Sequence, residues 1–394
     1  MKEKIQSSAK LIEDDLIKFL REIIAIPSIS GKENEVIKRM QREMEILGYD
    51  KIWTDPFGNL IGQIGSGKRI IAIDGHCDTV DVGNPDNWKS DPFTGDLIDR
   101  IIYGRGASDQ KGGLASAIYA GKIIKEIGIP EDVTLLVVAS VLEEVYEGLC
   151  WQYIINESKI VPESVILTEP TNLEIKIGQR GRMELKVETE GISCHGSAPE
   201  RGENAIYKMS EIISDIKLLN NKLVKQPVFG KGSITITDIR STAPCLCAVA
   251  DSCSIHLDRR LTTGETLESS INEITDLLSV NNSKAKVFVP EYEIKTYTGQ
   301  VYNAKAYYPI WLLEKEHPLV RTAMDANKSQ FHKEPIVGTW IFSTNGVVTK
   351  GIYDIPTIGY GPGKEEHAHT ADDQVNIKDL TIAAEFYSAF VLSL

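Results

Sequence analysis

Cysteine is scarce in this sequence, with six in a chain of 394 residues. So few thiols in so long a chain argue against the disulfide framework of a small secreted domain. Cys245 and Cys247, with Cys253, could belong to a partial zinc site, but no second pair of Cys or His follows at the spacing of a structural zinc site. We therefore predict that Cys245 and Cys247 share one face of a strand within residues 243–255.

The sequence also lacks a lysine- and arginine-rich stripe, a secretory leader and a long apolar run. Its net charge of −13 repels polyanions, so we expect no nucleic-acid partner. Residues 1–23 form an amphipathic pattern without the apolar core and cleavage site of a signal peptide. The most apolar stretch, residues 380–394, contains Glu385 and is shorter than the roughly 20 residues that a membrane-spanning helix needs. A cytoplasmic protein without a membrane partner is expected.

Length and apolar content are ample by comparison. Hydrophobic residues make up 42% of the chain and charged residues 25%, as in folded soluble proteins. A chain of 394 residues is longer than one hydrophobic core usually supports, so we expect at least two domains.

Helical patterns alternate with short apolar runs in the first part of the chain, which predicts an α/β fold with a mainly parallel sheet flanked by helices. The middle part changes to strands and helices typical of a small α+β sandwich. After Pro290 the chain looks irregular, and its last part then resembles the first domain resuming. The predicted domains are a discontinuous one of residues 1–180 and 300–394 and an inserted one of residues 181–299.

Three of the apolar runs end in side chains that bind metal ions. The segments in which they end are Asp74-Gly75-His76-Cys77-Asp78, Glu143-Glu144 and Thr168-Glu169. In a parallel α/β sheet, groups that follow separate strands converge beyond the carboxyl ends of those strands. Imidazole and carboxylate are ligands that borderline divalent metals such as zinc accept. The pattern therefore predicts a metal-dependent enzyme.

His76 and Asp78 are two residues apart in extended backbone, so their side chains point the same way. His76 can then bind a metal with one ring nitrogen while Asp78 accepts a hydrogen bond from the other. A hydrogen-bonded loop histidine is the alternative interpretation. Asp109 lies in a glycine-rich turn before a helix, where a simple N-cap would also explain it.

Glu143 and Glu144 form a like-charge pair at a strand end, which is unfavourable without a cation nearby. Because adjacent side chains diverge there, one can bind metal while the other faces the reacting water. Near the C-terminus, His367-Ala368-His369 precedes the last helix. Two-metal hydrolases need ligands for both ions and a bridging carboxylate, and this set supplies that number.

Further motifs accompany these residues along essentially the whole chain. They are residues 75–80, 88–95, 103–113, 143–144, 168–171, 194–199, 258–260 and 361–363 with His369. Together they resemble the dinuclear zinc aminoacylases and exopeptidases, a family that includes acetylornithine deacetylase, succinyl-diaminopimelate desuccinylase and carboxypeptidase G. The branch described as selenium-metabolism-linked hydrolases is the most similar.

The resemblance implies a role for each candidate ligand. His76 and Glu169 would bind one metal, Glu144 and His369 would bind the other, and Asp109 would bridge them. His367 is the alternative to His369. The ligands then belong to the discontinuous domain, and the inserted sandwich is a lid and dimerisation domain.

The resemblance also implies catalytic and substrate-binding roles. Glu143 would be the general base, Asp78 the partner of His76, and His195 an oxyanion donor, in related enzymes from across a dimer interface. The residues that would bind the substrate are Arg260, at a substrate carboxylate, with Asn345 and Gly361. Asn345 stands where several relatives have an acidic residue, which leaves the identity of the substrate open.

These roles predict a hydrolase that cleaves a linear amide bond of an N-acyl amino acid or small peptide, using a metal-activated water and the Glu143 base. The expected cofactors are two divalent ions, Zn²⁺ with Co²⁺ or Mn²⁺ as alternatives, and the expected assembly is a homodimer through the inserted domain. Two other functions stay open. The substrate could be an N-carbamoyl amino acid, or the chain could be a non-catalytic metal- or peptide-binding protein on the same scaffold.

Overall fold

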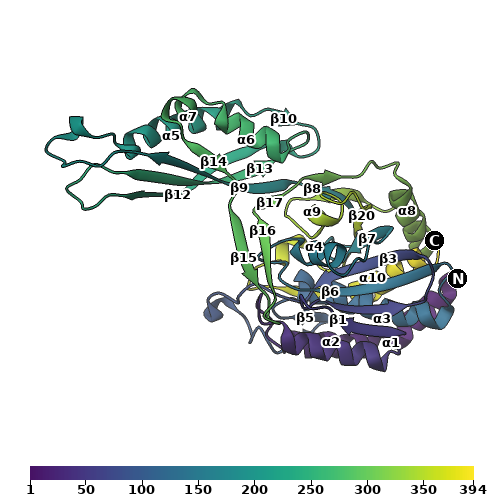
Figure 1. The fold of residues 1–394 in the computed structure, drawn as a ribbon. Helices are drawn as coiled ribbons and strands as arrows, with labels where there is room; N and C mark the ends of the chain where they lie inside the picture. The colour runs from purple at the N-terminus through teal and green to yellow at the C-terminus, as the bar shows by residue number, and fades with distance from the viewer. The chain divides into compact units, whose positions relative to one another are not determined.

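The computed structural model describes residues 1–394, and the chain folds into two compact units (Figure 1). The first unit contains residues 1–178, 295–302 and 312–394, and the second contains residues 179–294 and 303–311. This division differs from a single insertion because the chain returns briefly to the first unit after residue 294 and crosses once more before residue 312.

A nine-stranded sheet forms the centre of the first unit. In sheet order its strands are β1 (Lys51–Thr54), β2 (Leu60–Ile64), β6 (Val133–Ser140), β3 (Arg69–His76), β7 (Ser164–Leu167), β20 (Thr357–Gly359), β8 (Ile175–Gln179) and β18 (Trp311–Leu312), with β19 (Val337–Trp340) paired to β8. The central strands β6, β3, β7 and β20 are parallel, whereas β1, β2 and β8 pair antiparallel. Strand β6 is buried along its whole length, as parallel strands covered on both faces are.

The helices of the first unit are α1 (Lys2–Ile24), α2 (Asn34–Ile46), α3 (Gly112–Ile127), α4 (Leu149–Asn156), α8 (Pro318–Phe331), α9 (Gly346–Thr349) and α10 (Ile377–Val391). Helix α1 buries Ile5, Ile12 and Leu16 at helical spacing. Helix α3 packs against both α1 and α10. In α10 the ring of Phe386 stacks on Tyr360, with 3.6 Å between the ring centroids. Parallel strands flanked by helices confirm the predicted α/β class.

The second unit is an antiparallel sheet covered by helices. Its strands are β12 (Ser233–Thr242), β13 (Ser252–Leu261), β9 (Gly181–Glu190) and β14 (Lys286–Phe288) in sheet order, with β17 (Tyr307–Tyr308) paired to β9. Its helices are α5 (Ala205–Lys222), α6 (Leu267–Thr275) and α7 (Leu278–Ser283). Buried and half-buried residues alternate along β9 because one face of the sheet packs into a core of its own.

Three smaller pieces of sheet complete the fold. Strands β10 (Lys225–Gln226) and β11 (Gly230–Lys231) pair with each other. Strands β4 (Asp96–Ile98), β5 (Ile101–Tyr103) and β21 (Gln374–Asn376) pair in the order β21-β5-β4, which brings the C-terminal segment beside the chain that precedes Asp109. Strands β15 (Glu291–Lys295) and β16 (Val301–Lys305) form a hairpin. The prediction of irregular chain after Pro290 was therefore wrong, because short, largely exposed strands carry little hydrophobic pattern.

The predicted strand containing Cys245 and Cys247 was also wrong. Both residues lie in the exposed loop between β12 and β13, where the amide of Ala248 donates to the carbonyl of Cys245 over 3.1 Å and closes a turn.

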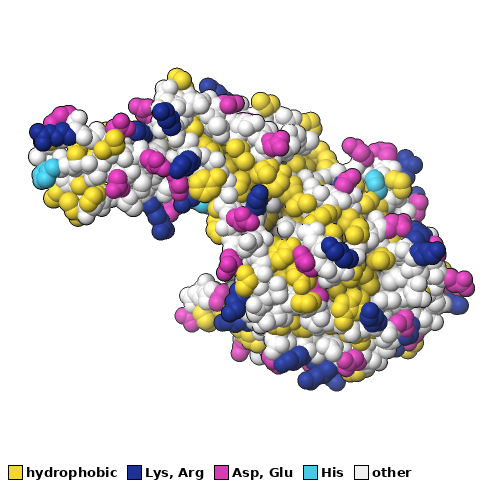
Figure 2. Space-filling view, viewed as in Figure 1, with side chains coloured by type: hydrophobic (Ala, Val, Ile, Leu, Met, Phe, Trp, Pro, Cys, Tyr) yellow, Lys and Arg dark blue, Asp and Glu magenta, His cyan; other side chains and the backbone are white.

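On the face drawn in Figure 2, lysine and arginine side chains are interspersed with aspartate and glutamate. No helix of the structure combines the length and the apolar character required to cross a bilayer.

Candidate metal centre

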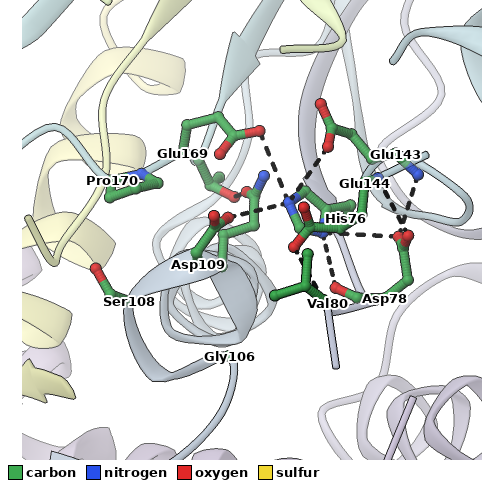
Figure 3. A network of polar contacts seen from close by, with 12 residues as sticks. His76, Asp78, Val80, Gly106, Ser108, Asp109, Glu143, Glu144, Glu169 and Pro170 are labelled. Atoms are coloured by element: carbon green, nitrogen blue, oxygen red, sulfur yellow. Dashed lines mark hydrogen bonds and ion pairs between the residues drawn. The ribbon is translucent and has the colours of Figure 1, made fainter. Parts of the chain in front are cut away.

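Three strand ends bring the candidate ligands together. The parallel neighbours β3, β6 and β7 end at His76, Ser140 and Leu167, at the same edge of the sheet. Glu143-Glu144 and Glu169 follow the last two strands and start from the edge at which His76 lies. Figure 3 shows these side chains pointing toward one another.

His76 has its tautomer fixed by the backbone. Its Nδ1 lies 2.9 Å from the carbonyl oxygen of Asp78, and because a carbonyl only accepts, Nδ1 donates and the neutral ring carries its lone pair on Nε2. Nε2 faces three carboxylates, at 3.2 Å from Asp109 Oδ1, 3.8 Å from Glu143 Oε2 and 3.9 Å from Glu169 Oε1. A neutral imidazole in this tautomer presents Nε2 as the metal-binding atom.

The Asp78 carboxylate holds the glutamate pair. It accepts hydrogen bonds from the backbone amides of Glu143 and Glu144, both over 3.2 Å, and from Ser30 Oγ over 2.7 Å. Its distance to Nδ1 of His76 is 3.6 Å. The backbone carbonyl of Asp78, and only secondarily its carboxylate, is therefore the partner of His76 in this structure.

Asp109 faces two imidazoles with its two oxygens. Oδ1 lies 3.2 Å from His76 Nε2 and Oδ2 lies 3.3 Å from His369 Nε2. Glu144 Oε2 lies 2.8 Å from the same nitrogen of His369. The Asp109 carboxylate therefore lies between His76 on one side and His369 with Glu144 on the other.

The site concentrates buried negative charge. Burial raises the pKa of the Glu143 and Glu169 carboxyls well above the ordinary value, and the charges of neighbouring carboxylates add to this effect. Hydrogen bonds that His369 donates to the Asp109 and Glu144 carboxylates raise its pKa to about 10. Burial works against a charged His76, but the hydrogen bond to Asp109 and the nearby glutamates outweigh it and raise that pKa. A cation bound among these carboxylates would favour their charged forms and so oppose the rise in their pKa values.

The donors fit divalent metal ions. His76, Glu143 and Glu169 form one group, and His76, Asp109 and Glu144 form another, with the potential ligand atoms in each group within 4.8 Å of one another. Glu143 Oε1 is buried without a hydrogen-bond partner, which is costly unless a ligand binds to it. Nitrogen and oxygen donors in this mixture suit zinc and other borderline ions.

The other predicted residues of the first unit lie outside the ligand cluster. His367 faces Asp372, with 3.8 Å between Nδ1 and Oδ2, so of the two histidines only His369 joins the cluster. Asn345 is 1% exposed and uses its whole amide on protein groups. Gly361 gives its amide to Thr171 Oγ1 over 2.9 Å. The side-chain amide of Asn345 and the backbone amide of Gly361 are therefore both hydrogen-bonded within the protein, and neither is free to bind a substrate.

Gly361 has a clear packing reason instead. A Cβ added there would lie 2.3 Å from the carbonyl oxygens of both Thr168 and Glu169. Only glycine therefore allows the turn to pass this close to the backbone that carries Glu169.

His195 and Arg260 belong to the second unit. His195 is exposed, and its Nδ1 accepts from the backbone amide of Ser197 over 3.1 Å, which leaves a hydrogen on Nε2 when the ring is neutral. The Arg260 side chain is 50% exposed, and its Nε and Nη2 donate to the two oxygens of Asp258 over 2.8 and 3.3 Å.

Sequence reasoning missed Asp373, a fully buried carboxylate that binds the turn before Asp109. A signal was present, because Asp372 and Asp373 are a like-charge pair shortly after His369, as Glu143 and Glu144 are after β6.

The sequence is similar to those of known proteins. Residues 72–393 match the family described as peptidase family M20/M25/M40. The chain is 47% identical over 389 residues to the uncharacterized protein YgeY of Escherichia coli strain K12, with 99% of this chain and 96% of that protein covered. It is 26% identical over 404 residues to the acetylornithine deacetylase of Pectobacterium carotovorum subsp. carotovorum strain PC1, with 95% and 96% covered.

A solved structure shares the fold. The Bacillus subtilis YXEP protein, described as a dinuclear metal binding peptidase, matches with a TM-score of 0.69 at 13% identity. The match covers 97% of this chain and 98% of that chain.

Proposed function

Because the chain belongs to peptidase family M20/M25/M40, we propose that it is a metal-dependent hydrolase that cleaves the amide bond of an N-acyl amino acid or a small peptide. The observation that carries the proposal is the placement of Asp109, whose two oxygens face His76 and His369. A carboxylate between two donor groups is the arrangement that a two-metal hydrolase needs.

The proposed ligand sets are those that the family resemblance implies, and these contacts support them. His76 and Glu169 would hold one ion, His369 and Glu144 would hold the other, and Asp109 would bridge them. We propose Zn²⁺ as the ion, with Co²⁺ and Mn²⁺ as alternatives that accept similar ligands. When bound, the two ions supply polarisation of the scissile carbonyl and a water that is acidic enough to react near neutral pH.

Glu143 is the proposed general base. Its backbone amide is held by Asp78, its Oε2 faces the cluster, and its Oε1 is buried without a partner. Burial raises the pKa of this carboxyl toward the range in which a group can take a proton and return it. Glu143 would take the proton of the attacking water and pass it to the leaving nitrogen.

Two residues of the second unit complete the proposal. His195 would donate from Nε2 to the oxyanion, which its hydrogen bond with Ser197 favours by fixing the acceptor on Nδ1. Arg260 would bind a substrate carboxylate with its planar guanidinium, for which the bidentate contact with Asp258 is a model. A homodimer formed through this unit is part of the proposal.

Glu143→Gln tests the base. The substitution keeps the size of the side chain and removes its ability to take a proton. We expect unchanged metal content and a loss of turnover of at least about 10²-fold, the usual contribution of a general base. Glu366→Gln is the matched control, because Glu366 is exposed and binds only Lys364 and His367. Metal content is measured by elemental analysis, and substantial turnover by Glu143→Gln would remove Glu143 from this role.

The substrate class is tested with the wild-type protein. A panel of N-acyl amino acids, dipeptides and N-carbamoyl amino acids, each with Zn²⁺, Co²⁺ or Mn²⁺, separates the alternatives. We expect amide hydrolysis without ammonia release, whereas ammonia from an N-carbamoyl amino acid would establish the ureido alternative. Less than one equivalent of bound metal and no turnover with any member would favour a non-catalytic binding protein.

A further inference from the structure

The Asp373 carboxylate organises the turn that leads into Asp109. It is fully buried. Its Oδ2 accepts from the amide of Gly106 over 2.7 Å and its Oδ1 accepts from the amide of Ser108 over 2.8 Å. The Arg105 guanidinium donates to Oδ2 over 3.2 Å. Two backbone amides and a guanidinium therefore converge on one carboxylate.

The turn has a shape that needs such an acceptor. Gly106 has a φ of +89°, which turns its amide and that of Ser108 toward the same point. Without Asp373 these buried amides would lack acceptors, which destabilises the turn. The residue after Ser108 is Asp109. Its backbone has a φ of −119° and a ψ of 97°, which lie outside the helical range. The direction of the bridging carboxylate thus depends on the turn.

Ser108 is bound from the other side as well. Its Oγ donates to the carbonyl of Lys364 over 3.0 Å and accepts from the amide of Lys364 over 3.1 Å. Lys364 and Asp373 are the two ends of the segment that carries His369. Both ends of that segment are therefore attached to Ser108, the neighbour of Asp109, and we call these contacts the Ser108 clamp.

His369 needs this support. Its side chain is 54% exposed, and its ring nitrogen Nε2 contacts the carboxylates of Asp109 and Glu144, which are themselves proposed ligands. Its backbone has a φ of +59°, which few residues other than glycine adopt without support. The backbone of the segment 364–373 therefore helps to set the position of the imidazole.

From these contacts we propose that Asp373 is a positioning residue which, through the Ser108 clamp, sets the separation of Asp109 and His369 and so controls the affinity and coordination of the metal that they share. The inference rests on the proposed dinuclear site. Residues that orient metal ligands typically contribute about 10- to 100-fold in metal affinity.

The test is a titration of metal-free protein with Co²⁺, followed by its visible absorption and by competition with a chelator. In Asp373→Asn the new side-chain NH₂ group is a donor, and it faces the backbone amides and the guanidinium, which are donors too. We expect one Co²⁺ to bind about 10- to 100-fold more weakly than in the wild type, with an altered absorption band. Asp372→Asn is the matched control, because its side chain is 45% exposed and contacts Lys89, Gln374 and His367 instead of the turn; it should titrate as the wild type does.

A second variant covers the case in which Asp373→Asn does not fold. Ser108→Ala removes only the Lys364 end of the clamp, and we expect a smaller loss of affinity in the same direction. The inference is overturned if folded Asp373→Asn binds two Co²⁺ ions with the affinity and spectrum of the wild type. Where Asp373→Asn does not fold, the same result for Ser108→Ala overturns it. Either result leaves the proposed dinuclear site standing. Wild-type protein that binds fewer than two Co²⁺ would overturn both this inference and the dinuclear site.

Discussion

Asn345 forms buried hydrogen bonds that its position in the sequence does not predict. Its Nδ2 donates to Asp74 Oδ2 over 2.8 Å and to Ser140 Oγ over 3.1 Å, and its Oδ1 accepts from the amide of Gly148 over 2.7 Å. Burial raises the pKa of the Asp74 carboxyl, and the hydrogen bond from Asn345 opposes that rise. Asp74 lies in β3, two residues before His76, so Asn345 stabilises the strand that ends in a proposed ligand.

Asn345→Asp should therefore destabilise the fold. The change removes both donors and sets a second carboxylate against Asp74, at a cost of about 1–3 kcal/mol at neutral pH. The folded-state pKa of the new carboxyl would be raised, so its contribution to stability is present at low pH and is lost as the pH rises above its unfolded value. Urea denaturation at pH 5 and pH 8 should show a deficit that grows with pH.

Asn87→Asp is the control for this prediction, because Asn87 is exposed and the same chemical change there should be nearly neutral. Wild-type stability of Asn345→Asp at both pH values, with a change in kcat/KM alone, would instead assign Asn345 to the substrate.

Residue identity could be predicted where the sequence carries a local signal. His76, Glu143 and Glu169 each follow a buried apolar strand, and polar groups at that position are costly without a partner. The roles of Asn345 and Asp373 could not be predicted in this way. Their decisive hydrogen bonds join residues 271 and 265 positions apart in sequence, and no local pattern encodes such pairs.

At the scale of elements, the contact of helix α3 with the end of β7 fixes the position of Glu169. A Cβ added to Gly113 would lie 2.1 Å from the carbonyl oxygen of Thr168, the residue before Glu169. That oxygen belongs to the backbone, so either the helix or the strand end would have to shift.

Gly113→Ala should thus lower both stability and metal affinity. Overpacking of this kind costs about 1–3 kcal/mol, and the displaced Glu169 should weaken one metal. Gly338→Ala is the matched control, because a Cβ there meets nothing nearer than the Lys176 side chain at 3.8 Å. Thermal denaturation and Co²⁺ titration measure the two effects, and equal results for both variants would show that the close approach to Thr168 has no such role.

Element type was predictable from the helical hydrophobic period of α1 and from the continuous apolar runs of the parallel strands β3, β6 and β7. It was not predictable for the β15–β16 hairpin. Its tip is held by single contacts, such as the Tyr297 hydroxyl that donates to the carbonyl of Gly58 over 3.0 Å. Such long-range contacts leave no periodic trace in the sequence.

At the scale of the molecule, each unit has a core of its own. Met183, Leu185 and Leu257 belong to the core of the second unit, which is built from β9, β13 and the helices above them. All the proposed ligands lie in the first unit. Metal binding should therefore stabilise one unit and leave the other unchanged, since a ligand stabilises only the structure that binds it.

Removal of metal should separate two thermal transitions. Ions present at 100 times their dissociation constant add about 2.7 kcal/mol to the unit that binds them, so a chelator should lower the first unit's midpoint and leave that of the second. Tryptophan fluorescence identifies the transition of the first unit, because Trp53, Trp88, Trp151 and Trp340 lie in that unit. Calorimetry with and without chelator measures the shift. A single transition that moves as a whole would show that the two cores unfold as one cooperative structure, as the repeated crossings of the chain between them would allow.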